Sequence, residues 1–155
     1  MFAGDGPLHA ELERRSGSLG FADRVHFLGF VNQTGLPAVY VASDLMVLPS
    51  DYEPFGLVVN EAMICGCPAL VSDRVGAKYD LVQEGITGGV FPCGDVDALA
   101  SAIRSLLSNR PRLAQMSAAA RERLKSWTPE MNVESFVETV ELAVKRNSRT
   151  GKKVH

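Results

Sequence analysis

Two glutamates, Glu53 and Glu61, lie eight positions apart around a Pro-Phe-Gly turn that leads into an apolar segment. An ionised carboxylate only accepts hydrogen bonds, so the pair suits a ligand that is rich in hydroxyl groups. The first residues of a helix expose unpaired backbone N–H groups at the positive end of the helix dipole, which suits a phosphate. Hydroxyl groups at both ends with phosphate between them describe a nucleotide sugar.

Each glutamate also has an ordinary explanation. Glu53 precedes Pro54, which favours an extended backbone, and it follows a predicted strand, beyond whose end the ligands of open parallel sheets bind. A solvated loop residue that caps a neighbour fits that position too. Glu61 lies one turn inside the predicted helix among apolar residues, where a carboxylate either needs a partner or merely interacts with the helix dipole. Residue types alone leave both alternatives open.

Three further patterns are weaker than they look. Gly56 allows a ligand to approach the backbone closely, but glycine is common in any turn. Gly4-Asp5-Gly6 lacks the third glycine of the dinucleotide fingerprint, because His9 stands in its place. Asp95-Val96-Asp97 resembles a metal-binding pair, yet it stands where a helix needs its cap, so we expect Asp95 or Asp97 to be that cap. No histidine lies near the two glutamates, which argues against a local histidine base.

Composition excludes several classes of protein. The 155 residues are 46% hydrophobic and 22% charged, as in an average globular domain, and the net charge of −2 does not favour nucleic-acid binding. Cys65 and Cys67 form a C-x-C pair without the spacing of a zinc site, so we interpret them as small buried side chains in a protein of the reducing cytoplasm. No apolar run reaches the roughly 18 residues that a membrane span needs.

Short apolar runs alternate with helical patterns along the chain. We expect the end of a strand at 2–3, followed by strands at 25–28, 45–48, 68–71 and 89–91. Helices are expected from the turn at Pro7 onward, and at 36–42, 56–64, 78–83, 95–107, 110–125 and 129–145. This alternation predicts an α/β fold, a Rossmann-like parallel sheet with helices on both faces. We expect one partial domain over 1–145 and a polar, frayed tail over 146–155.

Several motifs in order resemble one family. They are Gly4-Asp5-Gly6-Pro7-Leu8, Val25-His26-Phe27-Leu28-Gly29, Ala42-Ser43-Asp44 with Val47-Leu48-Pro49-Ser50, Glu53-Pro54-Phe55-Gly56-Leu57 through Glu61-Ala62-Met63, Gly66-Cys67-Pro68 and Gly85-Ile86-Thr87-Gly88. The chain resembles the C-terminal domain of retaining GT-B-type glycosyltransferases of family 4, which have two Rossmann-like domains. Each motif is weak alone, but the ordered set is specific.

The resemblance implies roles for matching positions. Glu53 is the catalytic candidate, holding hydroxyls of the donor sugar and orienting its anomeric carbon. Glu61 is implied to accept the ribose hydroxyls, and the backbone around Val31 to meet the base. The implied donor-binding residues are Phe55, Gly56, Leu57, Val58, Glu61 and Val31. Such enzymes transfer sugar with retention and usually without a metal, so the resemblance implies neither a metal nor a cofactor, in agreement with the lack of an evident histidine base.

The resemblance also implies missing parts. The family carries an upstream strand with an Arg and a Lys that neutralise the diphosphate, and an N-terminal acceptor domain; neither is found in this sequence. We therefore expect a partner, either that domain or a complementing chain, and an inactive, poorly stable fragment when the chain is alone, because the central strand of its sheet is absent. Basic residues after 144 suggest at most peripheral membrane contact.

The family function is transfer of a sugar from a nucleotide-diphosphate sugar to a hydroxyl acceptor in polysaccharide biosynthesis. The alternative is a non-catalytic nucleotide-sugar binding module or a subunit of a split enzyme. A remnant without any ligand is a third possibility. A related hexosamine epimerase fits less well, because its chemistry needs acids and a histidine across the cleft.

Overall fold

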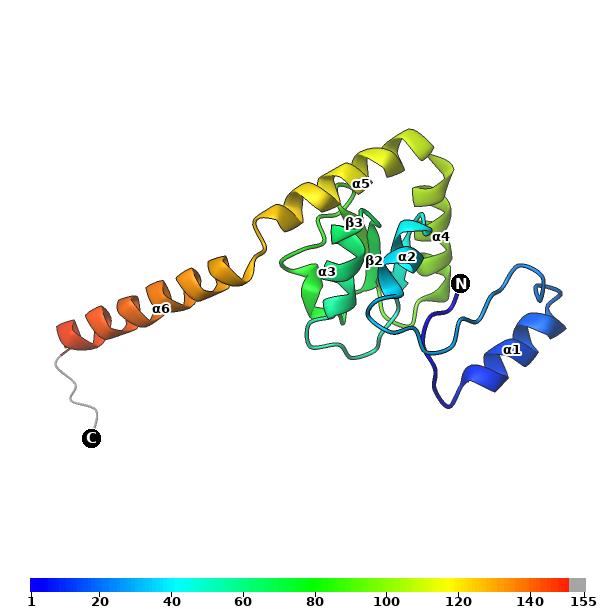
Figure 1. Cartoon of the computed structure of the whole chain (residues 1–155), viewed down its shortest axis with the longest axis horizontal. Helices are drawn as coiled ribbons and strands as arrows, with labels where there is room; N and C mark the ends of the chain where they lie inside the picture. Colours follow the sequence, from blue (N-terminus) through cyan, green and yellow to red (C-terminus); the bar gives the residue numbers. More distant parts are fainter. Residues whose placement is uncertain (151–155) are drawn as a thin grey trace.

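The computed structural model describes residues 1–150. In chain order the elements are α1 (His9–Ser18), α2 (Leu36–Val41), β1 (Met46–Leu48), α3 (Leu57–Ile64), β2 (Ala69–Ser72), the 3-10 helix η1 (Gly76–Lys78), β3 (Gly88–Phe91), α4 (Val96–Ser108), α5 (Arg110–Lys125) and α6 (Pro129–Thr150). The three strands and the helices α2 to α5 form the body, while α1 lies on one side of it and α6 extends away on the other (Figure 1).

The sheet is parallel, with strand order β1-β2-β3 among the described residues. Met46 pairs with Ala69 in one ladder, and Ala69 pairs with Gly88 in the other. All four residues of β2 are buried, as the uninterrupted apolar run predicts for a strand covered on both faces. The predicted α/β fold with a parallel sheet is therefore confirmed.

Alternate residues of β2 point into two separate cores. Ala69 and Val71 pack with Val59 of α3 and with Ala120 and Leu124 of α5. On the opposite face, Leu70 packs with residues from the neighbouring strand and helices, namely Phe91, Leu106 and Met116. The two clusters fix α3 on one face of the sheet and α4 on the other, while the long helix α5 contributes to both.

Two predicted elements differ from the structure. The strand at 25–28 is reduced to one parallel bridge between Phe2 and Phe27, because this short pair has no further strand beside it. The helix predicted at 78–83 is wrong: only the 3-10 turn Gly76–Lys78 forms. Val75, Ala77, Leu81 and Val82 are all buried, and this spacing places side chains in the core without following one helix face.

Three local predictions can be compared with the structure. The carboxylate of Asp95 accepts a hydrogen bond from the Ala98 N–H at 2.8 Å, so the predicted cap of α4 is confirmed. Cys67 is buried, and that burial raises the pKa of its thiol to about 11, while Cys65 is only half-buried. The last helix continues past the predicted end at 145 through Thr150, and the rest of the predicted tail, 151–155, lies outside the described residues.

The outer edge of β1 is open. Met46 donates its N–H to Pro68 of the β2 side at 2.9 Å, so the alternation of a strand directs the backbone groups of Val47 to the opposite edge. A hollow of about 280 Å³ lies there, and its lining includes Met1, Ala3 and the residues of β1. The central strand that the resemblance implies would pair with β1 at this edge.

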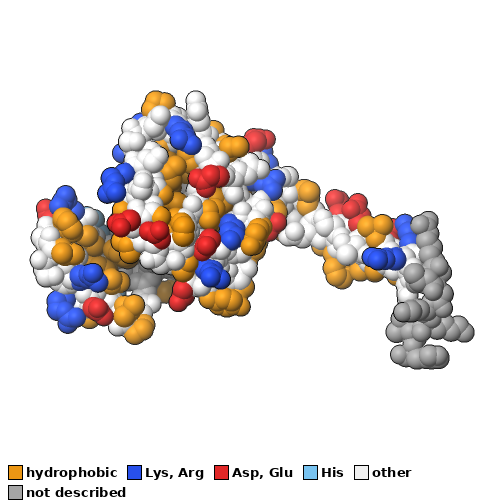
Figure 2. Space-filling model, turned by 180° about the vertical axis from the view of Figure 1, so that it is seen from behind, with side chains coloured by type: hydrophobic (Ala, Val, Ile, Leu, Met, Phe, Trp, Pro, Cys, Tyr) orange, Lys and Arg blue, Asp and Glu red, His pale blue; other side chains and the backbone are white. Residues whose placement is uncertain are grey.

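Hydrophobic side chains also remain exposed elsewhere. Figure 2 shows them on the body and along α6. Those on α6 are Met131, Val133, Phe136, Val137, Val140, Leu142 and Val144. An open strand edge together with exposed apolar side chains favours self-association.

We expect the isolated chain to self-associate at micromolar concentration, measured by light scattering during size-exclusion chromatography. Val47→Pro removes an N–H from the open edge and should reduce association while leaving the far-ultraviolet circular dichroism unchanged. Met46→Pro is the matched control: it removes the N–H that bonds Pro68 and should abolish the folded spectrum. A monomer with one cooperative thermal transition would contradict the expectation.

Candidate functional site

The candidate site lies where the parallel strands end. The loops after β1, β2 and β3 meet at this edge: the hydroxyl of Ser72 donates to the carbonyl of Ser50, and the Cys93 N–H donates to the Asp73 carboxylate at 3.0 Å. Side chains from three separate strand ends are thereby brought to one surface. The predicted segment from Glu53 to Glu61 begins on this surface.

Glu53 is held in place by the loop that follows β2. It forms a parallel bridge with Val75, and its carbonyl accepts the Gly76 N–H at 2.9 Å. Two residues on, the carbonyl of Phe55 accepts the Ala77 N–H at 2.7 Å. The Glu53 backbone is therefore extended, as expected for a residue before proline, and its half-buried side chain stands beside the start of α3.

The beginning of α3 is open to a ligand. Gly56, with φ of 97°, leads into the helix, and no side chain caps it. By contrast, side chains cap α4 and α5, those of Asp95 and Asn109. Leu57 follows with 69% of its surface exposed. No side-chain cap therefore takes the first amides of α3, which leaves them suited to an anion.

The surroundings of Gly56 are also tight for a side chain. A Cβ atom at this position would lie 3.3 Å from Cγ of Glu53 and 3.3 Å from Cδ2 of Leu48, in addition to the cost of the left-handed backbone. The absence of a side chain keeps Glu53 next to the helix start.

Glu61 has a partner from another helix. The hydroxyl of Tyr40 in α2 donates to Oε2 of Glu61 at 3.0 Å. Tyr40 is only 8% exposed, and burial, followed by the hydrogen bond to Glu61 and its negative charge, raises the pKa of the phenol above its ordinary value. The hydroxyl therefore stays protonated and donates to a carboxylate that has a second oxygen available.

Phe55 packs against a residue that lies far from it in the sequence. Its ring stacks on Trp127, which follows α5, with 6.3 Å between the ring centroids and an angle of 15°. Both side chains pack against the core that includes Val75 and Ala77. The chain has a single tryptophan, so this stack provides an intrinsic fluorescent reporter next to the candidate site.

The predicted base-binding position is separate from this segment. Val31 is half-buried in the loop before α2, where its Cγ1 atom would lie 3.1 Å from a Cβ on Gly35. The loop connects to the site through α2, whose Tyr40 bonds Glu61. No interaction that the structure shows among residues 1–150 joins Val31 itself to Glu53 or Glu61.

Sequence reasoning missed three contributors: Tyr40, Trp127 and the loop that follows β2. Tyr40 is the buried residue of the short helix α2, and the sequence of that helix does not reveal that Tyr40 bonds Glu61. A lone tryptophan after a helix does indicate a packing role, but not the ring on which it stacks. Gly76 before Ala77 indicates a turn rather than a backbone pairing.

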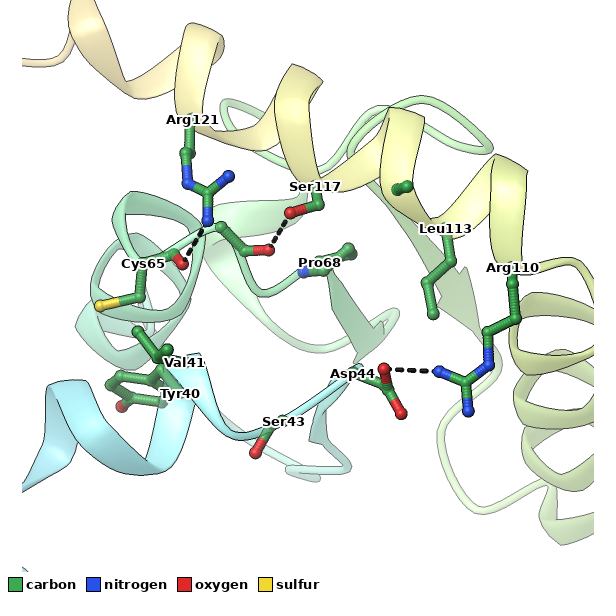
Figure 3. Close-up of a pocket in the computed structure, with 12 residues that line it drawn as sticks. Tyr40, Val41, Ser43, Asp44, Cys65, Pro68, Arg110, Leu113, Ser117 and Arg121 are labelled. Atoms are coloured by element: carbon green, nitrogen blue, oxygen red, sulfur yellow. Dashed lines mark hydrogen bonds and ion pairs between the residues drawn. The ribbon is translucent and has the colours of Figure 1, made fainter.

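A second pocket, of about 240 Å³, lies at the opposite end of the strands (Figure 3). Its polar side chains are already engaged: Arg110 pairs with Asp44 at 2.6 Å, and Arg121 donates to the carbonyl of Cys65 at 3.1 Å. Ser117 donates to the carbonyl of Gly66, so α5 clamps the end of α3 here. These contacts give the pocket a structural role.

Within the described residues, 1–150, no cluster of His, Cys, Asp and Glu side chains could hold a metal ion. Over the same residues, none of the helices combines the length and hydrophobicity that crossing a bilayer requires.

Comparison with known proteins defines the class. Residues 1–123 match the protein family described as glycosyl transferases group 1. The chain belongs to this family, and the resemblance to the C-terminal domain of GT-B glycosyltransferases is confirmed. A solved C-terminal domain of a group 1 glycosyl transferase from Francisella tularensis has the same fold, with a TM-score of 0.69 at 23% identity, covering 76% of this chain and 60% of that chain.

Two similar proteins of known sequence have names that differ from each other. The chain is 34% identical to N-acetyl-alpha-D-glucosaminyl L-malate synthase of Bacillus anthracis over 98% of its own length and 39% of the relative's. It is 40% identical to glycogen synthase of Mycobacterium tuberculosis over 79% of its length and 30% of the relative's. It thus spans between 30% and 39% of these two relatives.

Among solved structures, HepE of Anabaena in complex with UDP-glucose is similar to this chain, with a TM-score of 0.75 and 29% identity. The match covers 90% of this chain and 39% of HepE. The chain therefore resembles a fraction of a protein that binds a nucleotide sugar.

The pairing of the two loops generates a stability prediction. A Cβ at Gly76 would lie only 1.9 Å from the carbonyl oxygen of Pro54, so Gly76→Ala must displace the Glu53 segment. We expect a loss of about 1–3 kcal/mol, measured as a lower thermal midpoint. Gly6→Ala is the matched control, since nothing lies within 4 Å of its added Cβ. Equal midpoints for the two variants would show that the pairing is dispensable.

Proposed function

We propose that this chain is the donor-binding half of a retaining glycosyltransferase, which transfers sugar from a nucleotide-diphosphate sugar to a hydroxyl acceptor. The observation that carries the proposal is the uncapped start of α3 between two carboxylates, at the carboxyl edge of a parallel sheet. Open amides suit the diphosphate, and a carboxylate on either side suits hydroxyl groups.

The proposed roles follow the order of the segment. Glu61 accepts hydrogen bonds from the ribose hydroxyls. The amides of Phe55, Gly56, Leu57 and Val58 are proposed to meet the diphosphate and the adjoining sugar; in the free chain the Phe55 N–H donates to Oε1 of Glu53 at 3.4 Å. Glu53 accepts from hydroxyls of the donor sugar and orients its anomeric carbon, while the backbone near Val31 meets the base.

The comparisons support the substrate class. The structures of HepE were determined with UDP and with UDP-glucose, and the chain matches HepE over 90% of its length. The relatives named above transfer or join sugars, as their names say, and belong with this chain among the glycosyltransferases. We propose a nucleotide-diphosphate sugar for this chain, a reaction that needs no cofactor, a role in polysaccharide biosynthesis and a cytoplasmic location.

The second candidate function is a non-catalytic nucleotide-sugar binding module, or one subunit of a split enzyme. The hollow of about 280 Å³ between β1 and the first residues of the chain favours it, because it leaves the edge of β1 open to another chain. The chain also matches less than two fifths of its curated relatives. Incubation of the purified chain with UDP-glucose separates the two functions: released UDP indicates catalysis, whereas binding without turnover indicates a module.

The roles of the two glutamates generate a paired prediction. We expect Glu61→Ala to weaken binding of UDP about tenfold or more, since it removes a charged hydrogen-bond acceptor. Glu53→Ala should leave UDP affinity nearly unchanged and weaken discrimination between UDP-glucose and UDP-galactose. Titrations followed by the fluorescence of Trp127 measure both effects.

Glu122→Ala is the matched control, because it removes one negative charge from an exposed pair with Lys125 on α5. Its affinities should equal those of the unaltered chain. If Glu53→Ala and Glu61→Ala reduce UDP affinity to the same extent, the division of roles is wrong.

A further inference from the structure

The Tyr40–Glu61 pair joins two helices at the candidate site. Tyr40 belongs to α2 and Glu61 to α3, and the phenol oxygen lies 3.0 Å from Oε2 of the carboxylate. Because an ionised carboxylate has no proton to give, the tyrosine hydroxyl is the donor. This bond engages one carboxylate oxygen and leaves Oε1 for a ligand.

Tyr40 is itself rigidly placed. Its side chain is 8% exposed and packs in a cluster with Ala62 and Cys67, with Leu36 and Met46 beside it. Glutamate has three rotatable side-chain bonds and loses considerable freedom when it is fixed. A buried phenol that holds Oε2 removes that freedom before the ligand arrives, which favours binding through preorganisation.

We propose that Tyr40 is a positioning residue, which aims the Glu61 carboxylate at the adjacent hydroxyl pair of a ribose and so favours ribonucleoside over 2′-deoxyribonucleoside diphosphates. The proposal rests on the proposed function, in which Glu61 accepts those hydroxyls. It adds a residue from a different helix to the recognition of the sugar ring.

A purely structural role for Tyr40 makes a different prediction. A buried phenol needs some hydrogen-bond partner, and Glu61 would merely supply it. Removal of the hydroxyl would then lower stability, and any effect on affinity would be the same for ribose and deoxyribose. The two roles therefore differ in ligand discrimination, which calorimetry measures directly.

The experiment compares Tyr40→Phe with the unaltered full chain. Each is titrated by calorimetry with UDP, GDP and ADP and with their 2′-deoxy counterparts. For the diphosphate that binds most tightly, we expect Tyr40→Phe to lose roughly threefold to tenfold in affinity, while the 2′-deoxy form loses less than about twofold. In a Glu61→Gln background, Tyr40→Phe should cause little further loss, since the pair acts as one unit.

Ser117→Ala is the control for structural loss. It removes a hydrogen bond to the carbonyl of Gly66 at the other end of α3 without touching Glu61. Its thermal midpoint should fall, as for Tyr40→Phe, while its preference for ribose over deoxyribose stays that of the unaltered chain.

Each of the following results overturns the proposal. If Tyr40→Phe weakens ribose and deoxyribose forms equally, or leaves both unchanged while Glu61→Gln weakens binding, Tyr40 does not position the carboxylate. If its loss persists undiminished in the Glu61→Gln background, the effect does not pass through Glu61. If the unaltered chain binds none of the three diphosphates, or Glu61→Gln leaves affinity unchanged, the proposed function itself fails and this inference with it.

Discussion

The backbone pairing between the Glu53–Phe55 segment and the loop after β2 is the constraint on which the site depends. It places an extended residue, Glu53, directly before a helix start, and it needs a glycine at 76 because the carbonyl of Pro54 occupies the space of a side chain. The carbonyls of Glu53 and Phe55 accept amides from that loop, so the segment is fixed without using the first amides of α3. The start of α3 can therefore remain without a side-chain cap although the segment before it is held in place.

The contacts that support the Glu53–Glu61 segment differ between its two sides. The central strand β2 is buried on both faces, and α3 is fixed by the core beneath it and by α5, which clamps its end. Toward the open edge of β1, the link is the bond from α2 to Glu61. The two carboxylates therefore have different supports: Glu53 is held by the sheet's own loops, and Glu61 by a helix that borders the hollow beside β1.

Local patterns predicted local features, and non-local contacts escaped them. The strand β1, the start of α3 and the Asp95 cap each follow from neighbouring residues, since a proline, a glycine or a capping carboxylate acts within a few positions. The Tyr40–Glu61 bond and the Phe55–Trp127 stack join residues far apart in the chain, which no periodicity reveals. The helix expected at 78–83 failed because tertiary burial of Val75 and Ala77 outweighed local propensity.

In the proposed function, the negative charge of the two glutamates opposes the diphosphate. A diphosphate placed between Glu53 and Glu61 meets two negative side chains, and a helix start offsets only about 0.3–1 kcal/mol of that repulsion. Two cations of the loop after β2 lie near Asp73: Arg74 is 3.9 Å from its carboxylate and remains exposed, and Lys78 donates to its carbonyl. For the proposed function, Glu53 and Glu61 therefore support recognition of hydroxyl groups, and we propose that cations outside this surface neutralise the leaving diphosphate.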